Sequence, residues 1–486
     1  MLAMRNVLKK QGAGFMKFSV KYKIIFLILL GLIVLLTPIM FRYFYHDNLL
    51  IGEESYYNLR LASFVNENHV LPVNDDLSYG GRSIVDELGW IVLLALNPEL
   101  MSRLLPIALG LFSLVLFFLI AKTINQRIAV VSTILFILSP GFMYIFSVST
   151  KYSMAIFLGL LGFYLILKRS YFYGVLFLSL VSFFSFLGSI ASLFLFLILS
   201  FYKRYNKKYC LFGIFLSFLF MIIQYSRLYS LKLPGFTLFY LREEGINYFF
   251  QNIISDFGGL YGFGFVTLIL SLIGINALWK KKYKFLLIYI VIFLFLVLTS
   301  YLSFISFYLT VFISLLGGYG FITIQDSKWE SSLVKNITIF IIICAVIFSS
   351  VSYMDRLVSL QPTKEVYDAI YYLDRKPAED VVFSSYKRGL WINYGGKKNI
   401  IDSHFFYAPD ARERFSDSNI LFNTQDLDIA FNLINKYNIN YIWIDKLMKE
   451  DIWDNEEKDL LFLLNHSERF KKVFDNGYVE IWRVKG

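Results

Sequence analysis

The sequence is poor in cysteine and histidine. Its 486 residues include two cysteines and four histidines. Cys210 and Cys344 both fall in or beside apolar runs, and they give neither a disulfide framework nor the spacing of a zinc site. The histidines are scattered along the chain, so a histidine-based metal site is not expected.

The sequence also lacks the best-marked catalytic motifs. It contains no Gly-rich phosphate loop, no nucleophile elbow and no HExxH sequence, which are the marks of nucleotide-binding proteins, α/β-hydrolases and many metalloproteases. Internal repeats and low-complexity tracts are absent as well. Candidate functional residues must therefore come from short groups of charged side chains.

What the chain does have is a series of long apolar runs. Hydrophobic residues make up 57% of it, and its mean hydropathy is +0.58; a soluble protein would not carry so many runs of membrane-spanning length. We predict a polytopic α-helical membrane protein. Its transmembrane helices, about eleven by the length rule, are expected near 24–44, 101–121, 128–147, 152–167, 171–187, 189–202, 209–229, 261–279, 285–300, 304–324 and 336–354.

The loops between these runs alternate between basic and acidic residues. Basic clusters such as Lys203/Arg204 and Lys280–Lys282 are separated by acidic loops such as Glu53/Glu54 and Asp75/Asp76. Because Lys and Arg collect on the cytoplasmic side of membrane proteins, we expect a cytoplasmic N-terminus and an extracytoplasmic C-terminus in the cell membrane. The same rule explains the net charge of +11 better than nucleic-acid binding does, and no nucleic-acid partner is expected.

The composition changes near Leu360, where charged residues become common and apolar runs become short. We therefore predict a transmembrane domain over 1–355, with long outer loops at 45–100 and 230–260. A small extracytoplasmic α/β domain is expected over 356–486, which is within the usual size of a domain.

The predicted C-terminal domain has clear local signals. Thr363–Leu373 and Asp426–Tyr437 show helical periodicity, and Asp380–Ser384 and Tyr441–Asp445 are typical of buried strands. The tripeptide Asp475-Asn476-Gly477 predicts a hairpin, because Asn-Gly tolerates the positive φ of a type I′ turn.

Glu53 and Glu54 are the first candidates for catalysis. They follow the outer end of the first predicted helix, where paired carboxylates can act as a general base toward an acceptor or hold a divalent cation such as Mg²⁺ or Mn²⁺. Glu53 is the expected metal ligand if an ion binds. The alternative interpretation is a helix start whose acids offset the helix dipole.

Charged residues near the outer face are the candidates for substrate binding. Arg60, Arg82 and Arg242 run against the positive-inside trend, and a guanidinium group suits a lipid phosphate or pyrophosphate. Contact with ordinary lipid headgroups is the alternative. Glu243, next to Arg242 in the second outer loop, either lines the same cleft as Glu53 and Glu54 or belongs to an exposed turn.

Several short segments carry a family resemblance. Glu53-Glu54 is followed by Tyr56-Tyr57, Ser102–Pro106 reads Ser-Arg-Leu-Leu-Pro, and Ser139–Phe142 reads Ser-Pro-Gly-Phe. These segments resemble the first outer loop and the second and third helices of the lipid-carrier-dependent glycosyltransferases of the GT-C superfamily. That group includes protein O-mannosyltransferases, bacterial aminoarabinose transferases and catalytic subunits of oligosaccharyltransferases. Trp391–Gly396 and Ile400–Asp402 look like the outer domain of archaeal oligosaccharyltransferases.

The chain departs from the oligosaccharyltransferase pattern at two places. Those enzymes carry a Trp-Trp-Asp-Tyr-Gly signature for the acceptor sequon, where this chain reads Ser-Ser-Tyr-Lys-Arg-Gly over Ser384–Gly389. They also carry an acidic pair after the third helix, where this chain has Lys151-Tyr152-Ser153.

The resemblance implies an integral-membrane glycosyltransferase. It would move a sugar from a polyprenyl-phosphate-linked donor to a protein or glycan acceptor at the extracytoplasmic face, with Glu53 and Glu54 as catalytic residues and Tyr56 among the substrate-binding residues. One alternative is a non-catalytic relative that binds lipid-linked sugar or a partner. A transporter is the other alternative, but transporters usually bury ionisable residues near mid-membrane, where the predicted helices have none.

Overall fold

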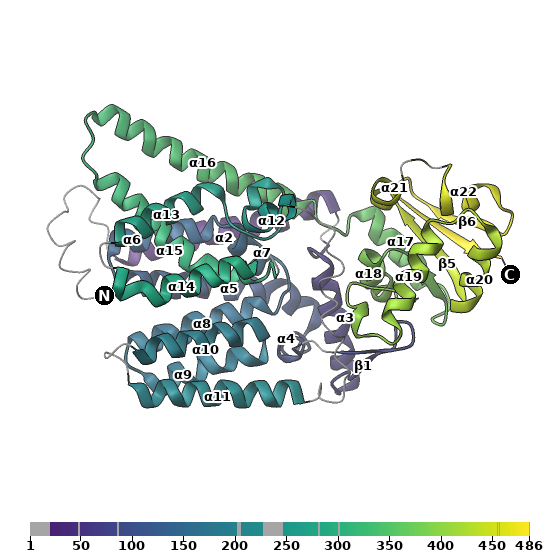
Figure 1. Cartoon of the computed structure of the whole chain (residues 1–486), viewed down its shortest axis with the longest axis horizontal. Coiled ribbons are helices and arrows are strands. Elements are labelled where there is room, and N and C mark those ends of the chain that lie inside the picture. The colour runs from purple at the N-terminus through teal and green to yellow at the C-terminus, as the bar shows by residue number, and fades with distance from the viewer. Residues whose placement is uncertain are drawn as a thin grey trace.

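The structure is a computed structural model that describes residues 20–46, 49–84, 87–201, 206–226, 246–279, 282–299, 302–453, 455 and 457–485. It has two parts (Figure 1): a bundle of roughly aligned helices and an α/β domain that packs against one end of it. Helix α3 (Glu53–Asn68) lies between the two parts. The predicted combination of a helical apolar region and a small C-terminal sheet region is confirmed.

The bundle is built from the apolar segments of the first three quarters of the chain. Its helices are α2 (Val20–His46), α5 (Pro98–Lys122), α6 (Gln126–Ile137), α7 (Pro140–Ser147), α8 (Tyr152–Leu167), α9 (Tyr171–Leu180), α10 (Phe186–Phe201), α11 (Lys207–Tyr225), α12 (Ile246–Ile253), α13 (Phe265–Leu278), α14 (Lys282–Thr299), α15 (Ile305–Asp326) and α16 (Ser332–Val358). A single 3₁₀ turn, Val181–Phe183, extends α9.

The expected count of eleven membrane spans is not confirmed. Among the described residues, five helices are long and apolar enough to cross a membrane: α2, α5, α11, α15 and α16. The pair α6 and α7 makes a sixth candidate, and other apolar helices are only 10–17 residues long. A run of 20 residues is the usual requirement for a straight crossing, so length alone does not establish the remaining spans.

The segment predicted as one helix over 128–147 is broken. Helices α6 and α7 meet at an angle of 60°, because α6 ends at Ile137 and Ser139 caps the start of α7. Its Oγ accepts a hydrogen bond from the backbone N–H of Phe142 and donates one to the carbonyl of Phe136. Pro140 then occupies the first position of α7, where its missing N–H costs nothing.

Helix α3 begins at a glycine in the left-handed region. Gly52 has a φ of 77°, which glycine adopts without a steric penalty. This sharp turn sets Glu53 and Glu54 in the first turn of α3, while Tyr56 and Tyr57 are buried. The short apolar segment that follows the loop after α3 forms α4 (Gly89–Leu94), which contacts α3 and α5.

The C-terminal domain contains a five-stranded mixed sheet in the order β4-β3-β5-β7-β6. Its strands are β3 (Val381–Phe383), β4 (Lys398–Asn399), β5 (Ile439–Asp445), β6 (Phe470–Asp475) and β7 (Val479–Val484). Strand β3 pairs in parallel with β4 and β5, whereas β7 pairs antiparallel with β5 and β6. The hairpin predicted at Asp475-Asn476-Gly477 is present, with a φ of 80° at Gly477.

Helices surround this sheet. They are α17 (Lys364–Asp374), α18 (Gly389–Tyr394), α19 (Ala411–Phe422), α20 (Leu427–Tyr437), α21 (Lys446–Ile452) and α22 (Asp459–His466). The central strand β5 supplies Ile442, Trp443 and Ile444, none of which is exposed to solvent. The domain therefore has its own apolar core.

The loop after α3 belongs structurally to both parts. Its short strands β1 (Asn74–Asp75) and β2 (Arg82–Ser83) pair with each other, and Ser78 forms a parallel bridge with Asn399 of β4. The backbone N–H of Tyr79 donates to the carbonyl of Asn399 at 2.9 Å. This loop thereby extends the edge of the C-terminal sheet and holds the domain against α3.

Arg42, near the end of α2, makes a second connection. Its guanidinium donates to five backbone carbonyls, those of Leu49, Leu50, Val358, Leu360 and Pro362. The residue is 1% exposed. These five hydrogen bonds join the ends of the first and last bundle helices to the segment that leads into the C-terminal domain.

Candidate active site

A cavity of about 410 Å³ lies where the bundle, α3 and the C-terminal domain meet. Such a volume is within the range of small-molecule sites. Its charged lining residues are Glu53, Glu54, Glu87, Lys151, Lys387 and Arg388. Aromatic groups surround them: Tyr57, Trp90, Tyr144, Tyr152, Tyr261, Phe304, Trp391 and His404. Leu260, from the second predicted outer loop, also lines this cavity.

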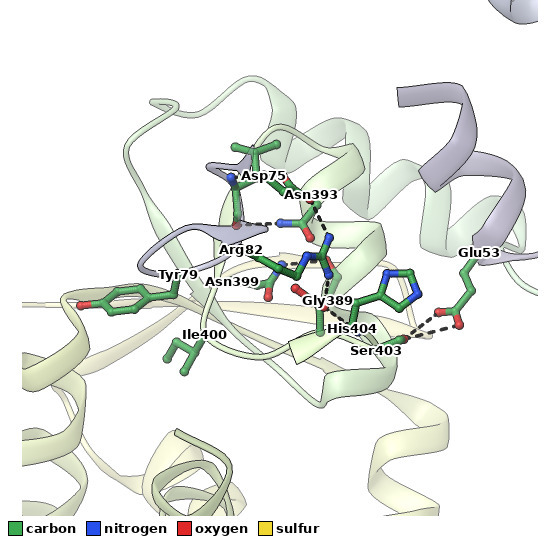
Figure 2. A network of polar contacts seen from close by, with 12 residues as sticks. Glu53, Asp75, Tyr79, Arg82, Gly389, Asn393, Asn399, Ile400, Ser403 and His404 are labelled. Atoms are coloured by element: carbon green, nitrogen blue, oxygen red, sulfur yellow. Dashed lines mark hydrogen bonds and ion pairs between the residues drawn. The ribbon is translucent and has the colours of Figure 1, made fainter. Parts of the chain in front are cut away.

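Glu53 enters the cavity from the start of α3 and contacts the C-terminal domain. Its carboxylate accepts a hydrogen bond from the Oγ of Ser403, at 3.4 and 3.3 Å to the two oxygens (Figure 2). Burial raises the pKa of Glu53 to about 7, although the Ser403 hydrogen bond and the charge of Arg388 act in the opposite direction. A carboxyl group with a pKa near neutrality is suited to take a proton from a substrate.

Glu54 points to the other side and is fixed by the segment before α8. It accepts a hydrogen bond from the hydroxyl of Thr150 at 2.7 Å. Close by, the Asn58 amide donates to the carbonyl of Ser149 at 2.9 Å. Adjacent residues on a helix point about 100° apart, which explains why the two glutamates contact different parts of the protein.

Lys151 lies directly before α8 and brings a positive charge into the cavity. Its ammonium group forms an ion pair with Glu87. The other carboxylate oxygen of Glu87 accepts hydrogen bonds from the backbone N–H of Phe186 and the hydroxyl of Tyr225, both at 2.8 Å. Glu87 is buried, and its donors come from three different segments, so it fixes the position of the lysine head group.

Two further cations come from the turn between β3 and α18. Arg388 makes two hydrogen bonds with Asp445, a buried carboxylate at the end of β5. Burial lowers the pKa of Arg388, but the hydrogen bonds and charge of Asp445 outweigh it, so the net shift is upward. Lys387 is more exposed and lies 3.5 Å from Asp451. The arginine therefore remains charged at any physiological pH.

Behind Glu53, a chain of ion pairs fixes the turn that carries Ser403. Arg82 contacts Asp402 at 2.5 Å and Asp75 at 2.7 Å, and Asp75 also binds Arg60 through two hydrogen bonds at 2.9 and 2.6 Å. Figure 2 shows Arg82 between the loop and the C-terminal domain. Because Asp402 also accepts the backbone N–H of His404 at 2.7 Å, the 402–404 turn has a defined position.

Three residues expected to face a substrate are held in other surroundings. Arg82 is buried between Asp402 and Asp75, and Arg60 pairs with Asp75. Tyr56 packs edge-on against the rings of Trp391 and Tyr394, at 5.2 and 4.8 Å between centroids. These contacts place each of the three at the junction between the two parts, and their role in substrate binding stays a prediction. Arg242 and Glu243 lie outside the described residues.

Among the residues that the structure describes, the donor set of the cavity does not fit a divalent metal ion. Such an ion is bound by several converging oxygen or nitrogen ligands, and the described residues contain no group of three or more His, Cys, Asp or Glu side chains that could hold one. Glu87 is occupied by Lys151 and two other donors. Glu53 and Glu54 contact different hydroxyl groups.

A second, apolar cavity of about 330 Å³ lies inside the bundle between α5, α8, α9, α10, α14 and α15. Its walls are almost entirely aliphatic and aromatic side chains, such as Phe117, Leu195 and Phe312. Tyr308 lines it, and its ring lies 6.4 Å from the ring of Tyr152, which lines the polar cavity. The two cavities therefore come close to each other at this pair of rings.

The sequence did not indicate Ser403, Glu87 or Arg388 as site residues. Ser403 and Arg388 reach Glu53 only through the fold, and nothing in their local sequence marks them. A signal did exist for Lys151, because it stands where the resembling enzymes carry an acidic residue.

No family model matches the chain, and no curated protein matches it either. Solved structures do. The oligosaccharyltransferase of Archaeoglobus fulgidus in its apo form superposes with a TM-score of 0.66 at 14% identity, over 90% of this chain and 71% of that protein. The same enzyme in complex with Zn and sulfate gives a TM-score of 0.60 at 13% identity, over 95% and 73% of the two chains.

ArnT from Cupriavidus metallidurans, bound to undecaprenyl phosphate, is also similar. Its TM-score is 0.56 at 9% identity, over 96% of this chain and 98% of that one. Both neighbours are members of the GT-C superfamily. The chain therefore has the fold of the GT-C membrane glycosyltransferases, as the short sequence segments predicted.

Proposed function

We propose that the chain is a membrane glycosyltransferase that uses a polyprenyl-phosphate-linked sugar and works at the extracytoplasmic face of the cell membrane. The observation that carries this proposal is the polar cavity at the junction, which combines a carboxyl group of near-neutral pKa with fixed cations. A base beside an anion-binding group is what transfer from a sugar phosphate requires.

The donor would occupy both cavities. Its phosphate is an anion, and Lys151 and Arg388 line the polar cavity, where ammonium and guanidinium groups bind phosphate well. Its polyprenyl chain is apolar and matches the neighbouring cavity in the bundle. Similar solved structures include one with undecaprenyl phosphate and one with a dolichol-phosphate, which supports a lipid phosphate as the ligand.

Glu53 would act as the general base. With a pKa of about 7, Glu53 is ionised in a large fraction of the protein molecules at neutral pH. The ionised carboxylate can accept the proton of an acceptor hydroxyl or amide. Glu54 would position the loop before α8 through Thr150, and with it Lys151. The sequence predicted that arginines of the first outer loop bind the phosphate; in this proposal Lys151 and Arg388 bind it.

The acceptor is a protein or a glycan, and the turn from Ser384 to Gly389 bears on the choice. Its Lys387 and Arg388 line the polar cavity, in the segment where oligosaccharyltransferases of the resembling group carry their sequon signature. An acceptor at this wall of the cavity meets Lys387 beside the site of the donor phosphate, so a glycan with anionic groups fits it better than a neutral Asn sequon.

The direct test is a set of three single substitutions. Glu53→Gln keeps the size of the side chain and removes its charge, and we expect it to abolish sugar transfer in membranes supplied with synthetic polyprenyl-phosphate sugars. Glu54→Gln should lower transfer less, because Glu54 acts through Thr150. Glu67→Gln, on the same helix but exposed, is the matched control and should keep the activity of the unmodified protein.

Mass spectrometry of surface glycans from cells with and without the protein would identify the transferred sugar. Full activity in both Glu53→Gln and Glu54→Gln would show that the acid pair is only a helix start. Binding of a lipid-linked sugar without any transfer would favour the non-catalytic alternative.

A further inference from the structure

The polar cavity has balanced charges. Among the described residues, its lining contains three carboxylates and three cationic groups: Glu53, Glu54, Glu87, Lys151, Lys387 and Arg388. A site built for a divalent cation needs an excess of oxygen ligands with negative charge. A lysine and an arginine within the same small cavity oppose the entry of such an ion.

Lys151 is held at the cavity wall and cannot move far from it. Its side chain is 20% exposed, and its ammonium group is paired with Glu87. Glu87 is in turn held by the backbone of Phe186 and the hydroxyl of Tyr225. The lysine therefore occupies a fixed place, as a group that stabilises charge in a reaction must.

The C-terminal domain supplies a second fixed cation to the cavity. Both hydrogen bonds of Arg388 go to Asp445, which is buried, and Arg388 lies close enough to Glu53 to affect its ionisation. A phosphate bound between Lys151 and Arg388 would lie next to the proposed base.

We infer that Lys151, with Arg388, supplies the positive charge that binds and stabilises the donor phosphate, so that sugar transfer by this chain needs no divalent cation. This inference rests on the proposed function. In the transfer step, the bond between the anomeric carbon and the phosphate oxygen breaks, and its electron pair stays on the phosphate. The acceptor oxygen bonds to the anomeric carbon and gives its proton to Glu53. Lys151 and Arg388 remain protonated and balance the additional negative charge on the phosphate.

The first experiment measures transfer by the purified full chain in nanodiscs, with EDTA and with added Mn²⁺. We expect the two rates to agree within about twofold. Lys151→Ala should lower kcat/KM by about a hundredfold, which is the usual effect of removing one group that stabilises transition-state charge, and Lys151→Arg should restore part of it. Lys436→Ala removes an ion-paired lysine of the C-terminal domain and should have no such effect.

The second experiment measures binding and does not require transfer. In EDTA, undecaprenyl phosphate should raise the Tm of the unmodified protein, and Lys151→Ala should weaken this binding by tenfold or more. Mn²⁺ alone should not change the Tm. Lys151→Asp, which places a further carboxylate in the cavity, should gain a Tm increase with Mn²⁺.

The inference is overturned if EDTA abolishes transfer and Mn²⁺ restores it, or if Mn²⁺ stabilises the unmodified protein and Glu53→Gln removes that effect. Unchanged lipid-phosphate binding by Lys151→Ala would overturn it as well. A protein that binds lipid phosphate through Lys151 in EDTA but transfers no sugar would refute the proposed function and leave the assignment of Lys151 standing.

Discussion

Arg82 and Asp402 form a buried ion pair, 2.5 Å between Nη1 and Oδ1, that joins the loop after α3 to the C-terminal domain. The two residues are 320 positions apart in the chain, and Arg82 binds Asp75 of its own loop at the same time. The pair fixes the turn that carries Ser403 and His404. Because Ser403 contacts Glu53, the geometry of the proposed base depends on a domain that lies far away in the sequence.

Replacing Arg82 should destabilise the protein strongly. Arg82→Met leaves two buried carboxylates without their shared cation, and breaking a buried ion pair in this way typically costs about 3–5 kcal/mol. The expected loss is read from the thermal unfolding of the purified protein. Arg375→Met is the control, since Arg375 stacks on the ring of Tyr371 and an exposed cation–π contact contributes only about 0.5–1 kcal/mol. Equal stability of the two variants would contradict the structural role of Arg82.

The pH dependence of transfer should report the ionisation of Glu53. A base must be deprotonated, so the rate should rise about tenfold per pH unit below the pKa of Glu53, which is about 7, and level off above it. Burial raises this pKa most, the hydrogen bond from Ser403 and the charge of Arg388 lower it, and the charges of Glu54 and Asp402 raise it further.

Ser403→Ala should therefore move the midpoint of the pH–rate profile to higher pH, because the variant loses a hydrogen bond that favours the charged carboxylate. Ser416→Ala, at an exposed position of α19, should leave the midpoint unchanged. A profile that stays in place in Ser403→Ala would show that Glu53 is not the titrating base.

Gly389 should not tolerate a side chain. A methyl group there would lie 2.5 Å from the Cα atom of Asp402 and from the carbonyl oxygen of Ile401, a distance at which the backbone must shift. Gly389→Ala is expected to cost about 1–3 kcal/mol in stability, as overpacking does. It should also lower transfer, because the displaced turn carries Ser403. Gly477→Ala strains only the exposed hairpin, so it should leave the transfer rate of the folded protein unchanged.

Filling the apolar cavity should weaken donor binding more than chemistry. Ala191 lies on its wall, and Ala191→Phe would occupy space that the polyprenyl chain needs. We expect a higher KM for the lipid-linked donor with little change in kcat, which is the pattern of lost binding outside the reacting centre. An unchanged KM for long-chain donors would place the polyprenyl chain elsewhere.

The proposed topology has a simple test. The basic loops predict that the C-terminal domain is extracytoplasmic, so a reporter fused after Gly486 should be active only outside the cytoplasm. A cytoplasmic reporter signal would place the candidate site on the wrong side for an extracytoplasmic transferase.

The sequence allowed prediction wherever the signal was local. The hairpin at Asp475-Asn476-Gly477 depends on the backbone preferences of three consecutive residues, and it is present. The position of Glu53 and Glu54 beside a cavity followed from their place after the first long helix. The bend between α6 and α7 also had a local signal in Pro140, but a continuous apolar run concealed it.

The remaining features depend on partners that are distant in the chain. Arg60 and Arg82 are of the residue type that binds phosphate, and the sequence therefore predicted a substrate role for them. In the structure they pair with carboxylates instead: Asp75 of the same loop, and for Arg82 also Asp402. Whether an arginine binds a substrate or a buried aspartate cannot be decided without knowing which segments meet. The same holds for Ser403, whose contact with Glu53 spans 350 positions.

The connection made by Arg42 has a consequence for biosynthesis. Its carbonyl partners include Val358, Leu360 and Pro362, which are synthesised more than 300 positions after the arginine itself. Domains generally form in the order in which they leave the ribosome, so Glu53 of α3 lacks its contact with Ser403 until the C-terminal domain has emerged. A chain that ends before the C-terminal domain would therefore lack Lys387, Arg388 and Trp391, which line the polar cavity.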